Sequence, residues 1–151
     1  MSVIGIIPAR YGSSRFPGKP LADILGKSMI QRVYEQCKKT SSLNKIIVAT
    51  DDERIFNHIL GFGGKVIMTS SSHPSGTDRC NEVIQKLEEQ YDIAINIQGD
   101  EPYINPEQID QVANLFSSKE VSIATLVKKI EDKSLISDIN SPKAIFDSKL
   151  F

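Results

Sequence analysis

The sequence predicts a three-layer α/β/α fold, in which helices cover both faces of a Rossmann-like, mainly parallel β-sheet. Three observations support this prediction. Short apolar runs alternate with amphipathic segments of helical periodicity, which is the pattern of βαβ units. The runs are apolar at almost every position, as in strands that are buried on both faces. Finally, 151 residues with 40% hydrophobic content suit one globular domain.

The predicted strands are short apolar runs that end at polar or turn-forming residues. The first run leads directly into a loop rich in glycine, serine and proline, and the fourth leads into the turn QGDEP. Beyond residue 130 the pattern weakens, and residues 144–146 form a candidate further strand. The five main strands are expected at residues 3–7, 45–49, 66–68, 93–97 and 121–127.

The predicted helices carry apolar residues at the i, i+3, i+4 and i+7 spacing that places them on one buried face. Ser28 is suited to cap the first helix, and Pro106 is suited to begin the fourth, because proline fits the first helical turn. Glycines end the second helix. The helices are expected at residues 29–39, 52–60, 77–90 and from 106 onward, with a short helix near 133–136.

Composition and charge exclude several classes of protein. The charged residues are interspersed and sum to a net charge of −1, whereas nucleic-acid-binding domains are usually basic. No apolar stretch approaches the ~20 residues that span a bilayer, and the N-terminal apolar run is too short for a signal peptide. Cys37 and Cys80 lack the spacing of a metal site and fall on apolar helix positions. We therefore expect reduced core thiols in a cytoplasmic protein that binds neither nucleic acid nor a membrane.

The loop after the first strand combines positive charge with a flexible backbone. Glycine lets the backbone approach a ligand, while serine hydroxyls and exposed amides donate hydrogen bonds. In a chain of near-neutral net charge, this local positive charge favours a small polyanion, above all a nucleoside triphosphate. The alternative is a solvated basic loop. The residues concerned are Arg10, Arg15, Lys19, Gly12, Gly18, Ser13 and Ser14.

Two common nucleotide-binding motifs are absent from the sequence. A Walker A loop has four residues between its glycines and a serine or threonine after its lysine, whereas five residues separate Gly12 from Gly18 and Pro20 follows Lys19. That proline lacks an amide hydrogen and blocks the helix start that wraps a phosphate. No GxGxxG occurs, so a dinucleotide site is unsupported. The loop must therefore hold phosphate in another way.

Polar residues follow each of the first four predicted strands. Because ligands of parallel sheets bind beyond the carboxyl ends of the strands, we expect these residues to surround one crevice with a basic and an acidic wall. The alternative is that strand ends simply need polar turns. Besides the first loop, the residues are Thr50, Asp51 and Asp52, the segment 69–79 with His73, Ser75 and Gly76, and Gln98, Asp100 and Glu101.

Asp100 and Glu101 are the best candidates for a metal ligand, because Mg²⁺ usually binds one or two carboxylates together with phosphate oxygens and water. The alternative is an acidic turn before Pro102. Ser75 or Gly76 either caps a helix or faces a ligand. His73 is either a base or a surface turn residue, and the mid-helix His58 is expected to be structural.

Four motifs in this order resemble those of the 3-deoxy-manno-octulosonate (Kdo) cytidylyltransferases, also called CMP-Kdo synthetases: IPARYGSSRFPGKPL, IIVATDD, SSSHPSGTDR and NIQGDEP. The resemblance implies the fold of the nucleotide-diphospho-sugar transferases. It also implies that CTP and Kdo condense, with Mg²⁺, to CMP-Kdo and pyrophosphate for lipopolysaccharide synthesis. Similar enzymes that activate sialic acid carry an asparagine where this chain has Pro20, and many other sugar nucleotidyltransferases have a glycine in place of Arg10.

The resemblance also implies roles for particular residues. Arg10, Lys19 and Asp100 would be catalytic, with Asp100 as a Mg²⁺ ligand. Gln98 would contact the sugar, and Ser75, Gly76 and Arg79 would lie on the cytidine side. The nucleotide- and substrate-binding residues implied are Ala9, Arg10, Ser13, Arg15, Lys19, Ser75, Gly76, Arg79 and Gln98.

Members of the resembled family continue for roughly another hundred residues beyond Phe151. In that family the further residues carry a second Mg²⁺-binding aspartate, more of the Kdo pocket and most of the dimer contacts. We therefore expect residues 1–151 to be the N-terminal part of a CTP-binding domain that is a homodimer when full length. We also expect an exposed sheet edge that is prone to association, and weak or no turnover. The alternatives are transfer to another acidic sugar, such as sialic acid, and a catalytically silent nucleotide-binding fragment.

Overall fold

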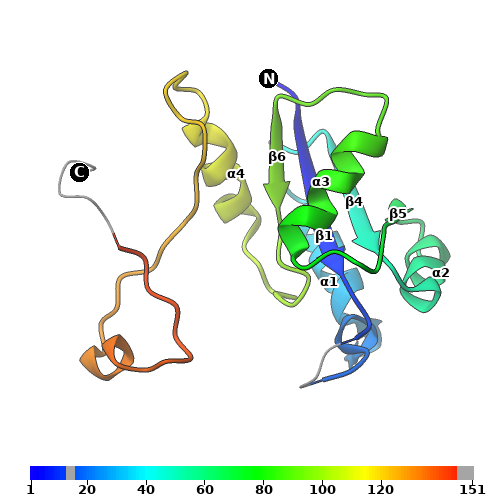
Figure 1. The fold of residues 1–151 in the computed structure, drawn as a ribbon, viewed down its shortest axis with the longest axis horizontal. Coiled ribbons are helices and arrows are strands. Elements are labelled where there is room, and N and C mark those ends of the chain that lie inside the picture. The colour runs from blue at the N-terminus through cyan, green and yellow to red at the C-terminus, as the bar shows by residue number, and fades with distance from the viewer. Residues whose placement is uncertain (13–15, 146–151) are drawn as a thin grey trace.

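The central element of the fold is a parallel sheet, seen in a computed structural model that describes residues 1–12 and 16–145. Its strand order is β5-β4-β1-β6, and every neighbouring pair is parallel (Figure 1). The predicted parallel sheet is therefore confirmed. The strands are β1 (Val3–Ala9), β4 (Lys45–Thr50), β5 (Val66–Met68) and β6 (Ile93–Asn96).

Helices cover both faces of this sheet and complete the predicted three layers. Successive side chains of a strand point to opposite faces, so Val3 and Ile7 of β1 join one apolar core while Ile4 and Ile6 join the other. The first core contains α1 (Met29–Cys37), α2 (Glu53–Gly61) and α4 (Pro106–Leu115). The second contains α3 (Gly76–Lys86).

Side-chain caps begin the helices where the sequence indicates. Ser28 caps α1 by accepting a hydrogen bond from the Gln31 amide at 3.2 Å. Ser75 caps α3 in the same way, so the choice between Ser75 and Gly76 falls to the serine. Pro106 stands at the start of α4. Between β1 and α1 lie a 3-10 turn, η1 (Lys19–Leu21), and a small hairpin of β2 (Asp23–Ile24) and β3 (Lys27–Ser28).

Some predicted boundaries differ from those observed. β1 continues to Ala9, and α1 ends at Cys37 rather than residue 39. The largest difference is α3, which ends at Lys86 instead of residue 90. Leu87 has an extended backbone, with φ −82° and ψ 135°. The segment after α3 is held at the start of β4, where Lys45 Nζ contacts a carboxylate oxygen of Glu89 at 2.8 Å.

The predicted strand at 121–127 is wrong, because this segment is neither strand nor helix. β-propensity alone does not form a strand, because a strand also needs backbone hydrogen bonds to a neighbouring strand. In the described part of the chain β6 pairs with β1 alone. Residues 122–126 line a groove along the free edge of β6 without pairing with it, and Ile123 is 91% exposed. β6 is thus an edge strand, and its association remains a prediction.

The last part of the chain carries little regular structure. The short helix predicted near 133–136 is confirmed as a 3-10 helix, η2 (Lys133–Ile136). Residues 144 and 145 do not form the candidate strand, and both are exposed, so they lack the partner that a strand needs. Phe146, the end of that candidate, lies outside the described residues.

The two cysteines are free and buried, as predicted. They lie on opposite faces of the sheet, because Cys37 belongs to the core of α1 and Cys80 to that of α3. Among the described residues no helix has the length and apolar character needed to cross a membrane.

Candidate active site

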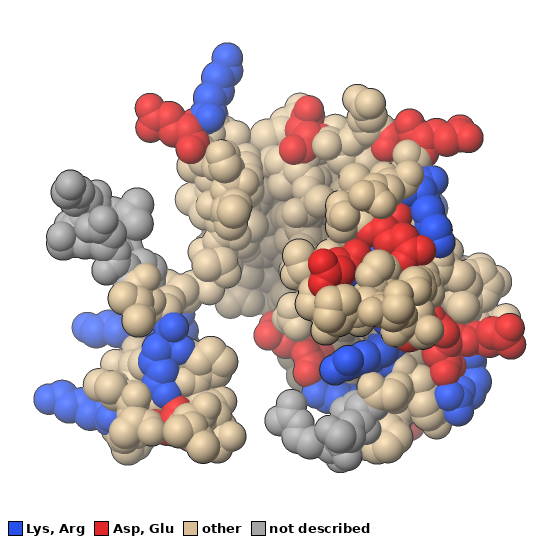
Figure 2. All heavy atoms as spheres, in the orientation of Figure 1, with Lys and Arg blue, Asp and Glu red and all other residues tan. Residues whose placement is uncertain are grey.

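The carboxyl ends of all four strands of the central sheet lie at one end of the domain, at the bottom of Figure 1. Basic and acidic side chains adjoin one another at this end, in the lower part of Figure 2. The polar segments that the sequence places after the strands therefore meet at one edge, as parallel sheets require.

Pro8, near the end of β1, is the point where two of these segments converge. A Cβ on Gly99, just after β6, would lie 2.9 Å from the carbonyl oxygen of Pro8, so no larger residue fits there. A Cβ on Gly76, at the start of α3, would lie 3.2 Å from Pro8 Cγ. The chain after β6 and the start of α3 thus pack directly against the end of β1. The predicted convergence is present in the structure.

The basic and acidic walls touch through Lys19 and Asp100. Lys19 Nζ lies 2.5 Å from Asp100 Oδ2, and the two side chains remain 36% and 49% exposed. Lys19 is placed by a turn in which Gly18 has φ +71°, a conformation that favours glycine. The Gly18 amide donates to the carbonyl oxygen of Tyr11 at 2.9 Å. A partly exposed cation and carboxylate therefore form an ion pair at the carboxyl edge of the sheet.

Tyr11 is supported from α2. The Arg54 guanidinium lies 3.3 Å from the centroid of the Tyr11 ring, a cation–π arrangement. Arg54 is held in turn by Asp52, whose Oδ2 lies 2.6 Å from Arg54 Nη2. The hydrogen bonds from Arg54 lower the pKa of Asp52. Asp52, expected on the acidic wall, thus caps α2 and anchors the arginine that stacks on the first loop.

Arg79 occupies an interior position near the carboxyl ends of β4 and β5. Its side chain donates to Thr69 Oγ1 at 2.5 Å and to Asp51 Oδ2 at 3.1 Å, and the residue is only 4% exposed. Arg79 therefore joins the end of β4 to the segment that follows β5. A direct contact of Arg79 with cytidine stays a prediction, and the contacts observed hold Asp51 and Thr69 together.

The other predicted site residues are distributed around the same edge. Ala9 is buried at the end of β1, and Arg10 and Gln98 are exposed. With the residues that the structure describes, Arg10 forms no ion pair. Ser13 and Arg15, like Ser14, lie outside the described residues.

The two histidines make structural contacts. His58 Nε2 lies 2.6 Å from Ser28 Oγ, which ties α2 to the start of α1. His73, the candidate base, contacts a carboxylate oxygen of Glu82 on α3. Glu82 was not singled out by sequence reasoning, because a carboxylate in the middle of a helix looks like part of a solvated face.

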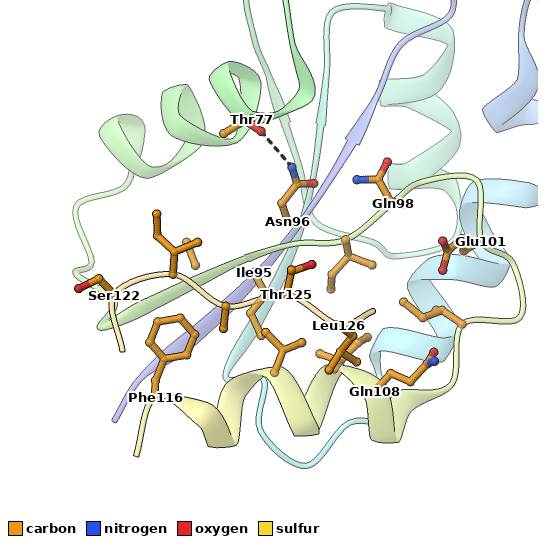
Figure 3. A pocket seen from close by; sticks show the side chains of 17 residues that line it. Thr77, Ile95, Asn96, Gln98, Glu101, Gln108, Phe116, Ser122, Thr125 and Leu126 are labelled. Atoms are coloured by element: carbon orange, nitrogen blue, oxygen red, sulfur yellow. Dashed lines mark hydrogen bonds between the residues drawn. The ribbon is translucent and has the colours of Figure 1, made fainter. Parts of the chain in front are cut away.

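A groove of about 670 Å³ runs along the free edge of β6 toward α4 and residues 122–126 (Figure 3). Gln98 and Glu101 line one end of the groove, Phe116 and Ser122 line the other, and Thr77 and Asn96 lie between them. Sequence reasoning found Gln98 and Glu101 but missed Asn96. The signal for Asn96 was the alternation of Ala94, Asn96 and Gln98 along one face of the strand.

A metal ion would depend on Asp100 in this site. Among the described residues no cluster of three or more histidine, cysteine or acidic side chains is placed to hold a metal. Asp100 offers one partly exposed carboxylate, which is paired with Lys19. A single carboxylate fits Mg²⁺ that arrives with phosphate oxygens and water, and does not fit a site built from protein ligands alone.

Comparison with known proteins identifies the family. A family model described as cytidylyltransferase matches residues 4–150. The chain belongs to the cytidylyltransferase family. It is 52% identical over 148 residues to the 3-deoxy-manno-octulosonate cytidylyltransferase of Cytophaga hutchinsonii, covering 98% of this chain and 59% of that relative. It is also 53% identical to the 8-amino-3,8-dideoxy-manno-octulosonate cytidylyltransferase of Shewanella sp. (strain W3-18-1), covering 100% of this chain and 63% of that relative.

A solved cytidylyltransferase structure agrees with the fold. The structure of a CMP:2-keto-3-deoxy-manno-octonic acid synthetase complexed with CTP matches with a TM-score of 0.74 and 50% sequence identity. The match covers 78% of this chain and 48% of that structure. The chain thus spans less than two thirds of the length of these cytidylyltransferases.

Proposed function

We propose that this domain binds CTP with Mg²⁺, and that its site serves transfer of the cytidylyl group to Kdo, giving CMP-Kdo and pyrophosphate for lipopolysaccharide synthesis. The observation that carries the proposal is the Lys19–Asp100 contact of 2.5 Å at the carboxyl edge of the sheet. It brings together a lysine that can bind phosphate and a carboxylate that can bind Mg²⁺. The names of the similar proteins, and the CTP bound in the solved structure, support the choice of nucleotide and sugar.

Lys19 and Arg10 would act on the phosphates. When CTP enters, the Lys19 ammonium exchanges the Asp100 carboxylate for phosphate oxygens, and Arg10 adds a second positive charge from the same loop. Negative charge grows on pyrophosphate as it departs. A fixed cation that meets this charge lowers the barrier of the reaction.

Asp100, released from Lys19, would hold Mg²⁺ beside the phosphates. The bound Mg²⁺ would neutralise phosphate charge and make the α-phosphorus more open to attack. Asp100 is suited to this because Gly99 brings the backbone against Pro8, so the carboxylate stands directly at the end of β1.

Gln98 would orient the acceptor sugar. In the transfer, the anomeric oxygen of the sugar forms a bond to the α-phosphorus and releases its proton to solvent water, while the bond between that phosphorus and the pyrophosphate oxygen breaks and its electron pair leaves with pyrophosphate. The hydroxyl must therefore stand opposite the leaving group. Gln98 and Glu101 line the groove end that adjoins Asp100, which is a suitable place for a polar sugar. Homodimerisation and a cytoplasmic location stay predictions.

Binding and chemistry can be tested separately. In a thermal-shift experiment with Mg²⁺, we expect CTP to raise the melting temperature more than UTP, GTP or ATP. A ligand at 100 times its dissociation constant stabilises a protein by about 2.7 kcal/mol. Equal shifts with all four nucleotides would indicate an unselective anion site and contradict the proposal.

Pyrophosphate release then tests the chemistry. It is measured after addition of Kdo, 8-amino-3,8-dideoxy-manno-octulosonate or sialic acid to the chain with CTP and Mg²⁺. Pyrophosphate release with Kdo supports Kdo as the acceptor. Release with only one of the other sugars would contradict this and identify that sugar as the acceptor. CTP binding without release from any sugar would assign this chain a nucleotide-binding role alone.

A further inference from the structure

Glu82 of α3 connects three groups around the segment that follows β5. Its Oε2 accepts a hydrogen bond from the Ser70 amide at 2.9 Å and contacts the His73 ring. Its Oε1 lies 2.6 Å from Lys86 Nζ. The side chain is 19% exposed, so these contacts are shielded from water on most sides. Hydrogen bonds from Lys86, His73 and the Ser70 amide hold the pKa of this carboxylate near 2.

Glu82 is the centre of a row of contacts along α3. Arg79, one turn earlier, donates to Thr69, and Lys86, one turn later, donates to the carbonyl oxygen of Met68 at 2.8 Å. These three side chains are spaced i, i+3 and i+7, so they lie on one side of the helix. Together they fix the chain from the end of β5 to His73 against α3.

This fixed segment leads into Ser75 and Gly76, the residues expected on the cytidine side. The segment contains no helix or strand of its own between β5 and α3. Its conformation therefore depends on the side-chain contacts from α3. A segment that is already ordered loses less conformational entropy when a ligand binds.

We propose that Glu82 is a positioning residue for the nucleoside part of the nucleotide: it holds Ser70 and His73 so that Ser75 and Gly76 face the bound cytidine. Glu82 does not touch the ligand in this account. His73 shares this positioning role, because its ring contacts the Glu82 carboxylate. The inference rests on the proposed function, since it concerns the cytidine side of that site.

Two probe ligands separate this role from general stabilisation. Glu82→Ala should raise the dissociation constants of CTP and CMP by the same factor, about 3- to 10-fold, by loosening the segment. It should leave the dissociation constant of inorganic tripolyphosphate unchanged, because the contacts of Glu82 in the described part of the chain include neither Arg10 nor Lys19. Isothermal titration calorimetry measures all three. Glu82→Gln keeps an acceptor for the Ser70 amide and should show a smaller loss.

Controls keep the outcomes distinct. Glu88→Ala removes an exposed carboxylate shortly after the same helix and should leave all three affinities unchanged. If Glu82→Ala does not fold, the same three dissociation constants are measured for Glu82→Gln and His73→Ala. Equal weakening of CMP and tripolyphosphate, or no weakening of either, would overturn the positioning role alone. A wild-type chain that bound neither CTP nor CMP would overturn the proposed function and this inference with it.

Discussion

Lys19 and Asp100 lie 81 positions apart in the sequence, yet their charged atoms are 2.5 Å apart at the carboxyl edge of the sheet. The pair neutralises a cation and a carboxylate that would otherwise face each other without partners. Both side chains are partly exposed, so the pair adds little to folding stability and can separate at low cost. We infer that each residue is held ready for a charged ligand rather than for its partner.

Replacement of Lys19 should affect the chemical step. In an active cytidylyltransferase that contains this domain, Lys19→Ala should lower kcat by roughly 10²-fold, about 3 kcal/mol, if the ammonium meets charge on the departing pyrophosphate. Steady-state kinetics of pyrophosphate release measures this. Lys38→Ala, on the exposed end of α1, is the matched control and should have no effect. A change confined to KM would show that Lys19 only helps to bind CTP.

Replacement of Asp100 should weaken the effect of magnesium. In the wild-type chain, Mg²⁺ should tighten CTP binding, and Asp100→Asn should reduce that gain by removing a charged ligand. Calorimetric titration of CTP with and without Mg²⁺ gives the gain directly. Glu120→Gln, at an exposed carboxylate beyond α4, should behave as wild type. An unchanged magnesium dependence would remove Asp100 from the ligands of the metal.

Glu82 should stabilise the fold in a pH-dependent way. Its pKa falls from an ordinary value of 4.5 to about 2, because Lys86, His73 and the Ser70 amide donate to it. A carboxyl group with a lowered pKa in the folded state stabilises above its unfolded pKa, and this contribution is lost as pH falls through the window between the two values. The free energy of unfolding should therefore differ between wild type and Glu82→Gln most near about pH 7, and less near about pH 3.

Urea denaturation at both pH values measures the difference. Other carboxylates titrate in both proteins, so comparison of the two removes most of their effect. A difference that grew on acidification would contradict the contacts assigned to Glu82.

The cysteines should be unreactive in the folded chain. Burial raises the pKa of both thiols to about 12, and only the thiolate attacks disulfide reagents. With Ellman's reagent near about pH 8, we expect slow reaction of the native chain and fast reaction of both thiols in guanidinium chloride. Rapid reaction of the native chain would show that Cys37 or Cys80 is accessible, contrary to the packing described.

The sequence predicted those parts of the fold that depend on local pattern. The four strands of the sheet, the caps at Ser28 and Ser75 and the start of α4 at Pro106 follow from periodicity and backbone chemistry, and all are observed. The segment 121–127 shows the limit of such reasoning. Its residues suit a strand, but a strand exists only where another strand pairs with it, and pairing is set by distant parts of the chain.

The candidate site could be predicted from the sequence only where it follows from the topology of the sheet. Convergence of the strand ends follows from parallel topology, which is why Lys19 and Asp100 could be expected near one another. The partners of buried charges could not be predicted in this way. The resemblance implies that Arg79 lies on the cytidine side, which stays a prediction, but nothing in the sequence indicated its hydrogen bonds to Thr69 and Asp51. Glu82 gave no sequence signal, because its importance lies in contacts with a segment that precedes its own helix.

A crystal structure of the chain with CTP and Mg²⁺ tests the central claim most directly. We expect the triphosphate between Lys19 and Asp100, with the two side chains separated, the metal on Asp100 and the cytidine toward Ser75 and Gly76. A nucleotide bound elsewhere, or one bound in the crevice while the Lys19–Asp100 contact stays intact, would contradict the account.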